Sequence, residues 1–517
     1  SLAFPGAAAA AGWAPAAAQP EPDSTELLAL PGGEAFSLSA GIEELRVSHR
    51  PPGAAFGAPE PVAEPSGGTV RARLVNAGGA TLLVWSDEAG AHVTERTAGG
   101  DWVLVPGAFG PAFAMPALGA AAGGGTLAAW REGTELRARE QPSGGGFGAV
   151  QVVASDLPPA ADPRDGDVPP AVTTTEDGFT VVVWGDREFK PRVGEPGEPG
   201  YRPATAIGTL RLAARPSGGD WAAPVELATR TMTSDFAEET PSAGYTGISA
   251  APRPGGGWIA AARSFGETTL DGPSGAEVSG SDAVEVREGA VGSVGTGPTY
   301  DAGTFDEEMG GEAAPWPLAV DPAGDVAVRW RRLARDGDVV SSAYRPAAGD
   351  FPAAPTAPAE MRGTVDVAPL GGARWYWLDA GDVAYFGQPL GLDASPSGLP
   401  PAGLAMEGEE RLQRLSGDGA GHVFLAAERI GSPPLPLRVY DEVAPALMEV
   451  AVPAAATPGQ PLRMAARAED LWTAASVEWD FGDGATATGD GVEHAFAAPG
   501  RYTVRVTAVD AAANRTT

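Results

Sequence analysis

The chain has 517 residues, of which 43% are hydrophobic, so it is long enough for two to four domains, each with its own core. Its 67 acidic and 35 basic residues give a formal charge of −32, which repels phosphate backbones and argues against a nucleic-acid partner. Cysteine is absent and the four histidines are far apart, so neither disulfides nor a structural zinc site is expected. No run of eighteen apolar residues predicts a membrane span.

Short strands are the expected secondary structure throughout. Helical periodicity is almost missing, and runs of roughly four to eight apolar or β-branched residues alternate with turn-forming clusters. The 72 glycines and 50 prolines fall mainly between these runs, as turn residues do. The pattern therefore predicts an all-β protein rather than a disordered one.

A repeated unit organises most of the chain. The apolar run 81–85 ends at Trp85 and the run 126–130 ends at Trp130, and in both copies an aromatic residue follows 17 positions later. Trp184 and Trp330 end two further runs of the same kind, with longer connections after them. A repeat of roughly 45 to 60 residues with about four strands is typical of a β-propeller blade. We expect these four tryptophans to fill space between blades.

The repeats predict a β-propeller over residues 25–443, with eight four-stranded blades and seven as the alternative. Eight expected second strands lie near residues 34–39, 80–85, 126–130, 179–184, 257–262, 325–330, 373–378 and 422–427. The last copy has no obvious fourth strand before Pro445, so an N-terminal arm at residues 1–24 is the candidate to close the ring. Residues 1–18 have an alternative interpretation as a processing remnant. The repeats resemble degenerate blades of extracellular bacterial propellers and lack the WD40 pattern.

A second motif lies between residues 444 and 517. Trp479 and Phe481 precede a Gly-Asp-Gly turn that contains Asp483, and Tyr502 begins a run with alternating apolar residues. The order and spacing resemble a PKD domain, which implies an immunoglobulin-like β-sandwich. We expect the two aromatic side chains to lie in its core and Asp483 to accept backbone hydrogen bonds in the turn. PKD domains occur as spacers and adhesion modules in secreted and surface proteins.

Long insertions mark the expected binding surface. They cover residues 154–168, 186–205, 229–243, 264–281 and 290–313, and the predicted register places them as loops on one face of the disc. Packing against another domain or subunit is the alternative role for these loops. The candidate binding residues on this face are Asp165, Asp167, Arg187, Glu188, Tyr201, Asp235, Glu238, Asp301, Asp306 and Glu307.

The sequence contains fewer signals for a catalytic or metal-binding site than for the fold. The acidic clusters in these insertions could supply the carboxylate pair of a glycosidase, but 67 acids produce such clusters by chance, and no nucleophile, phosphate-binding or zinc-protease motif accompanies them. No catalytic residue, cofactor or specific metal ligand is therefore predicted. Calcium remains a candidate ion, since loop carboxylates suit a hard cation outside the cell.

The first functional hypothesis is a non-catalytic recognition or adhesion protein, secreted or on the cell surface, that binds a glycan or a protein and uses the PKD-like domain as a spacer. The second is a structural subunit of a surface assembly that self-associates, and the third is a polysaccharide-active hydrolase. An N-terminal arm that packs on its own propeller favours the first hypothesis over the second. A composition rich in Ala, Gly and Pro, with Lys190 as the only lysine, is typical of a GC-rich bacterial genome.

Overall fold

The computed structural model describes most of the chain. The described residues are 12–18, 24–30, 32–41, 43–66, 71–112, 114–159, 168–236, 238–253, 255–272, 275–305, 318–320, 324, 326–332, 339–346, 349–354, 364–371, 374–379, 386–390, 410–417, 422–429, 436–441 and 443–517. Within them the secondary structure is entirely β. None of these residues forms a helix of the length and apolar character needed to cross a membrane.

The first three blades are regular four-stranded antiparallel sheets. Their strands are β2 (Ser24–Ala29), β3 (Ala35–Ala40), β4 (Leu45–Arg50), β5 (Glu60–Ala63), β6 (Arg71–Ala77), β7 (Ala80–Asp87), β8 (Gly90–Arg96), β9 (Trp102–Leu104), β10 (Ala117–Ala121), β11 (Gly125–Glu132), β12 (Glu135–Gln141) and β13 (Gln151–Ala154).

The fourth and fifth blades have the same strand order, but most of their strands are much longer. These are β14 (Ala171–Thr174), β15 (Phe179–Lys190), β16 (Ala204–Pro216), β17 (Val225–Ser234), β18 (Glu239–Pro252), β19 (Trp258–Gly272), β20 (Gly275–Gly289) and β21 (Thr299–Phe305). Much of what the sequence suggested as loops is therefore strand. The prediction of loops at 186–205, 229–243 and 264–281 was wrong in this respect, because the insertions continue the ladders of β15 to β20.

Three further sheets complete the ring. Their strands are β22 (Leu318–Val320), β23 (Val326–Arg332), β24 (Val339–Arg345), β25 (Thr364–Gly371), β26 (Arg374–Asp379), β27 (Phe386–Leu390), β28 (Glu410–Gly417), β29 (His422–Arg429) and β30 (Pro436–Asp441). The last sheet gains a fourth strand, β1 (Gly12–Ala18), which pairs antiparallel with β30. The N-terminal segment thus supplies the outer strand of the eighth blade.

The first strands of successive blades form a closed inner ring. Each contacts the first strand of the next blade, in the order β2, β6, β10, β14, β18, β22, β25 and β28, and β28 contacts β2. Counted over the described residues, eight sheets make up this ring, and the eight expected second strands correspond to β3, β7, β11, β15, β19, β23, β26 and β29. The prediction of an all-β propeller with eight blades is confirmed.

The hydrophobic core is divided among the spaces between neighbouring blades. One cluster joins Leu127 of the third blade to Trp184 of the fourth, and another joins Leu212 of the fourth to Trp258 of the fifth. Trp85, Trp130 and Trp330 lie buried in three further clusters of this kind. These repeats therefore bury apolar residues against the neighbouring blades, as expected of stacked blades.

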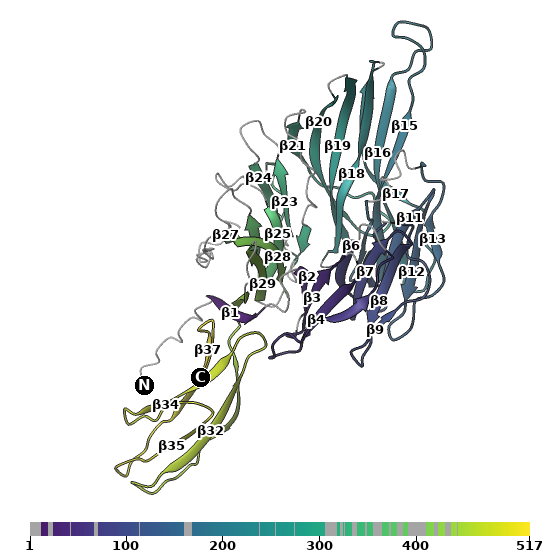
Figure 1. The fold of residues 1–517 in the computed structure, drawn as a ribbon. Helices are drawn as coiled ribbons and strands as arrows, with labels where there is room; N and C mark the ends of the chain where they lie inside the picture. The colour runs from purple at the N-terminus through teal and green to yellow at the C-terminus, as the bar shows by residue number, and fades with distance from the viewer. Residues whose placement is uncertain are drawn as a thin grey trace.

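The C-terminal residues form a β-sandwich that projects from one edge of the propeller (Figure 1). Its two sheets contain β31 (Ala446–Ala451), β32 (Leu462–Glu469) and β35 (Gly491–His494), and β33 (Ala475–Asp480), β34 (Thr486–Thr488), β36 (Arg505–Asp510) and β37 (Arg515–Thr516).

The core of the sandwich forms around the aromatic residues of its sequence motif. Trp479 and Phe481 are buried between the sheets, and the Trp479 indole donates a hydrogen bond to the carbonyl oxygen of Gly489 at 2.8 Å. The Asp483 carboxylate accepts the backbone N–H of Ala485 at 3.0 Å, as such turns require. Tyr502 is half-buried in the same core.

Candidate functional site

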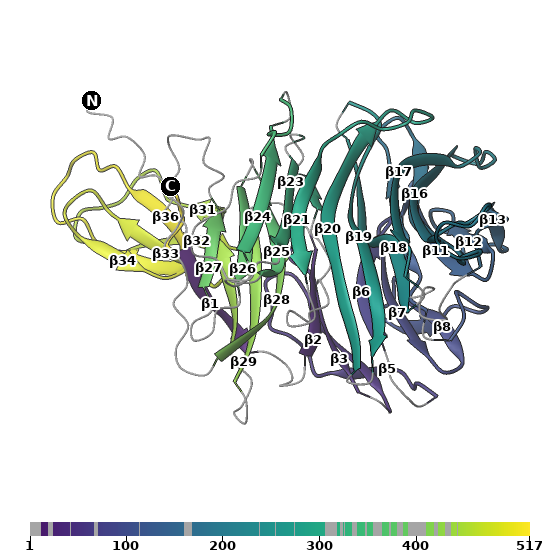
Figure 2. The ribbon, with the colours of Figure 1, turned by 90° about the horizontal axis from the view of Figure 1, so that it is seen from above.

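The long strands of blades 4 and 5 rise above the rest of the disc on one face (Figures 1 and 2). We call this projection the raised rim. It consists of residues 186–190, 204–209, 229–234, 239–246, 264–272 and 275–282, with the connections 191–203 and 235–238. The whole rim lies at one end of the two blades. At this end the second strand of each blade connects to the third, and the fourth blade connects to the fifth. The rim therefore lies on the face for which the sequence predicted long insertions, but it is built mainly from strands.

Small residues let the two sheets of the raised rim approach each other closely. At Gly208 of β16, an added Cβ would lie 2.5 Å from the Cα of Gly244 in β18, so position 208 has no room for a side chain. Between the same two blades, the buried Tyr245 side chain of β18 packs against Gly185 of β15. Glycine inside these strands therefore marks close packing of two backbones.

A charged and aromatic cluster fills part of the rim. The guanidinium of Arg187 lies 4.7 Å from the ring centroid of Phe265, and that of Arg263 lies 5.5 Å from the same ring. Arg263 also forms an ion pair of 2.6 Å with the buried carboxylate of Asp282. Burial raises the pKa of Asp282 and of the nearby Glu267, and the neighbouring arginines oppose that rise. We call these five residues the Phe265 cluster.

A second ionic group sits at the base of the rim, between the third and fourth blades. The buried carboxylate of Asp186 accepts hydrogen bonds from the Trp184 indole at 3.1 Å and is ion-paired with Arg211 at 3.0 Å and Arg131 at 3.5 Å. Burial raises the pKa of Asp186, and the two arginines lower it. This ionic group connects three strands and orients the Trp184 side chain, so its role is structural.

The predicted binding residues divide into several groups. Tyr201 and Asp235 meet at the outer end of the rim, where the Tyr201 hydroxyl donates a hydrogen bond of 2.6 Å to the Asp235 carboxylate. That bond raises the pKa of Tyr201. Arg192 approaches from the same connection and donates to the carbonyl oxygen of Asp235 at 3.3 Å.

The other predicted residues are not gathered at one point. Arg187 joins the Phe265 cluster, while the exposed Glu188 pairs with Lys190 at 3.3 Å. Glu238 is exposed beside β18, and Asp301 lies on β21. The remaining four predictions fall outside the described residues: Asp165, Asp167, Asp306 and Glu307.

Sequence reasoning missed Phe265, Arg263, Glu267 and Asp282. They lie in a stretch rich in Gly, Thr and Ser that has the composition of a loop. The one signal was Arg263-Ser264-Phe265, which continues the apolar run 258–262 by alternation and so extends the strand.

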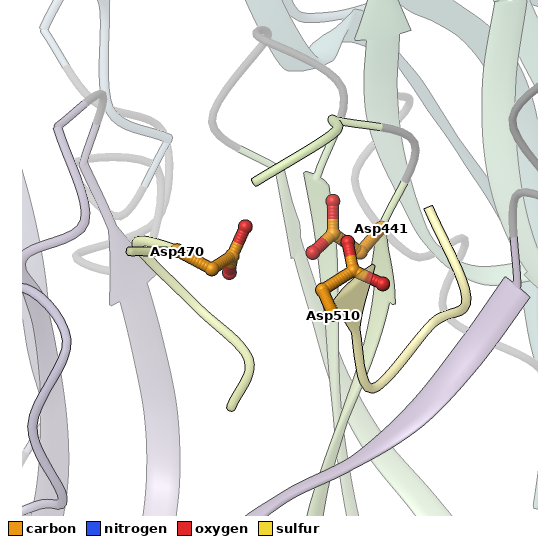
Figure 3. Close-up of side chains that lie close together, drawn as sticks. All are labelled: Asp441, Asp470 and Asp510. Carbon is orange, nitrogen blue, oxygen red and sulfur yellow. The ribbon is translucent and has the colours of Figure 1, made fainter. Parts of the chain in front are cut away.

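A different site lies at the junction of the propeller and the sandwich (Figure 3). Within the described residues, one group of three carboxylates is close enough to share an ion: Asp441, Asp470 and Asp510 each contribute an oxygen, and these oxygens all lie within 4.8 Å of one another. Asp441 and Asp510 are buried and Asp470 is half-buried. Burial raises the pKa of Asp510, with smaller contributions from the charges of Asp441 and Asp470.

The C-terminal sandwich can now be assigned to a family. Residues 442–517 match the family model of the PKD domain. The match agrees with the resemblance seen in the sequence, and the PKD domain of this chain therefore begins directly after β30. No curated protein matches the sequence significantly.

Solved structures with a similar arrangement belong to several classes. The polysaccharide lyase Uly1 is 11% identical with a TM-score of 0.36, and the match covers 75% of this chain and 92% of the lyase. Prolyl oligopeptidase B from Galerina marginata is 11% identical with a TM-score of 0.35, over 79% of this chain and 56% of the peptidase. A eukaryotic initiation factor is 8% identical with a TM-score of 0.37, over 84% of this chain and 98% of that chain. This chain spans about half the length of the peptidase.

Proposed function

We propose that this protein is a non-catalytic recognition or adhesion protein that works outside the cell, and that the raised rim binds a glycan or a protein. The observation that carries the proposal is the rim itself. Among the residues that the structure describes, the fourth and fifth blades are lengthened, both toward the same face, whereas turns on the other face, such as 217–220, stay tight. Elaboration confined to one face of a rigid scaffold is typical of a binding surface.

The polar and aromatic groups of the rim suit a polyhydroxylated or peptide ligand. Tyr201 offers a ring and a hydroxyl and Arg192 a donor from the connection 191–203, and Asp235 offers an acceptor from the adjacent connection 235–238. Ligand sites commonly combine an aromatic surface with a few directed polar groups.

Three described carboxylates of the rim support a binding role over a hydrolytic one. Asp282 is paired with Arg263, Asp235 with Tyr201, and Glu188 with Lys190. A glycosidase needs one protonated carboxyl and one carboxylate facing a sugar from two sides. Carboxylates that are already engaged with neighbours on the rim are poorly suited to that chemistry.

The pairing of β1 with β30 within the same chain supports recognition over assembly through a free arm. The PKD domain supports an extracellular setting and the role of a spacer that holds the propeller away from its anchor point. A bacterial source agrees with the composition.

Incubation of the purified protein with a panel of soluble and insoluble polysaccharides tests the proposal. Protein retained on the polysaccharide and sugar released from it are both measured. Retention without release is the expected result. Release would replace the proposal with a hydrolase or lyase, and the absence of both would exclude glycan recognition and leave a protein ligand to be sought.

A further inference from the structure

The junction between propeller and PKD domain is built around a buried set of oxygen atoms. Asp441 is the last residue of β30, Asp470 follows β32, and Asp510 ends β36, so three strand ends from two domains meet there. Figure 3 shows the Asp441 and Asp510 carboxylates side by side, with Asp470 facing them from the other side.

Positive charge near these carboxylates is scarce. The imidazole of His422 lies 3.2 Å from Asp441, and the described residues provide no ion pair for Asp470 or Asp510. The charge of Arg50 acts on Asp470 from nearby, while the hydrogen bonds of its guanidinium go to the carbonyl oxygens of Gly33, Leu471 and Trp472. Buried carboxylates that face one another need a cation or protons to balance them.

A separate observation points to a bound ligand. The Asn514 side chain is fully buried and its amide reaches into the cluster, where Nδ2 donates to Asp510 at 2.9 Å and to the carbonyl oxygen of Asp441 at 3.1 Å. The other end of the amide, Oδ1, is buried without a hydrogen-bond partner among the described residues. A buried amide oxygen left unpaired is costly, so its presence here requires an explanation.

A cation would balance the carboxylates and could also take the Asn514 amide oxygen as a ligand. A half turn of the Asn514 amide exchanges its nitrogen and oxygen without changing its shape, and Oδ1 would then face Asp510 and the carbonyl oxygen of Asp441. Those oxygens repel one another when no ion lies between them, but around a hard cation all of them become ligands. The carboxylate oxygens lie within 4.8 Å of one another, which is about twice the Ca²⁺–oxygen distance of roughly 2.4 Å.

We propose that Asp441, Asp470, Asp510 and Asn514 bind one calcium ion at the junction of the eighth blade and the PKD domain. Because the ligands come from both domains, the ion fixes the domain on the propeller. The site also lies at the closure of the ring, since Asp441 pairs with Gly12 of β1 and with His422 of β29. This proposal is independent of what the raised rim binds.

The test uses the whole chain, stripped with EDTA and titrated with Ca²⁺ in a calorimeter. Asp470→Asn and Asp510→Asn remove ligand charge, and Asp490→Asn is the control, an exposed aspartate of the same domain outside the cluster. One Ca²⁺ per wild-type and control chain is expected, with affinity at least about tenfold lower in the two variants, since ligand charge sets affinity in such sites. Mg²⁺, which prefers a smaller octahedral shell, should bind more weakly.

Two further readouts cover the case in which Asp510→Asn fails to fold. Asp470 is only half-buried, so Asp470→Asn carries the test alone if its unfolding in EDTA matches that of the wild type. Terbium bound in place of calcium should show luminescence sensitised by Trp472, whose ring lies 5.9 Å from the ring of His422, the ion-pair partner of Asp441. A wild type that binds no Ca²⁺ at millimolar concentration, or variants that bind as tightly as it does, would overturn the site. Small-angle scattering that is unchanged by bound Ca²⁺ would overturn its role in fixing the domain.

Discussion

The guanidinium of Arg50, at the end of β4, lies 4.6 Å from the ring centroid of Trp472 in the PKD domain. It also donates hydrogen bonds of 3.1 Å to the carbonyl oxygens of Leu471 and Trp472. Trp472 in turn packs with Leu27 and Val439, so the loop that follows β32 is seated between the first and eighth blades. The PKD domain is therefore docked on the propeller at the point where the ring closes.

Arg50→Ala should weaken this docking. Arg50 is almost fully buried, and the variant leaves three carbonyl oxygens without their charged donor, two of them in the PKD domain, which costs about 2 kcal/mol of interface stability. Limited proteolysis at residues 442–445 and thermal unfolding measure the effect. Arg46→Ala is the control, because its exposed ion pair with Glu44 contributes less than about 1 kcal/mol. Equal behaviour of the two variants would show that Arg50 does not hold the domain.

Removal of residues 1–18 should open the eighth blade. Without β1, the N–H and C=O groups of β30 lose their antiparallel partner, and an unpaired edge strand tends to associate with another chain. A lower melting temperature and concentration-dependent association in light scattering are expected. Removal of residues 1–10 alone leaves β1 in place and serves as the comparison. A monomer with unchanged melting temperature after the longer deletion would contradict closure by β1.

The sequence predicted the blades because their signal is local. Each second strand is an apolar run of five or six residues, and in four blades the run ends at a tryptophan that must be buried, so the eight runs identify β3 through β29 directly. The turn at Asp483 and the aromatic pair Trp479 and Phe481 are equally local. Patterns of this kind depend only on neighbours in the sequence.

The rim and the junction could not be predicted in the same way. Gly208 and Gly244 have the composition of a loop, yet they are glycines because two strands pass within van der Waals contact. Asp441, Asp470 and Asp510 come together only through the docking of two domains, and no periodicity connects residues so far apart. Their common feature, a position at the end of a strand, becomes informative once the strands are placed.

Asp87 should make stability depend on acidic pH. Burial alone would raise its pKa, but hydrogen bonds from Ser66, Ala89 and His92 outweigh burial and lower the pKa to about 2. The folded-state pKa is thus below the unfolded value of 3.8, so the stabilisation is present above about pH 4 and is lost as the pH falls from about 4 to about 2.

Asp87→Asn should remove this component, lowering the free energy of unfolding by about 2 kcal/mol at pH 7 and by much less at pH 2. Urea unfolding at several pH values measures it. Glu88→Gln, a change at the exposed neighbouring position, should follow the wild type throughout. A loss of equal size at pH 7 and pH 2 would assign the effect to packing instead of charge.

Trp479→Ala should unfold the PKD domain first. The side chain is buried at the centre of the sandwich, and its removal leaves a cavity that costs about 3 to 5 kcal/mol. Trp479→Phe retains most of the volume and loses the hydrogen bond to Gly489, so its cost should be clearly smaller. Guanidinium unfolding followed by fluorescence separates the two variants, and an equal loss in both would place the energy in the hydrogen bond.

The raised rim is tested most directly by comparing the retention of three proteins on the polysaccharide that holds the wild type best. These are the wild type, the double variant Tyr201→Ala with Asp235→Ala, and Asp220→Ala, which alters an exposed residue of the same blade on the opposite face. Loss of retention in the double variant alone is the result that rim recognition predicts. Equal retention of all three proteins, or loss only in Asp220→Ala, would contradict it.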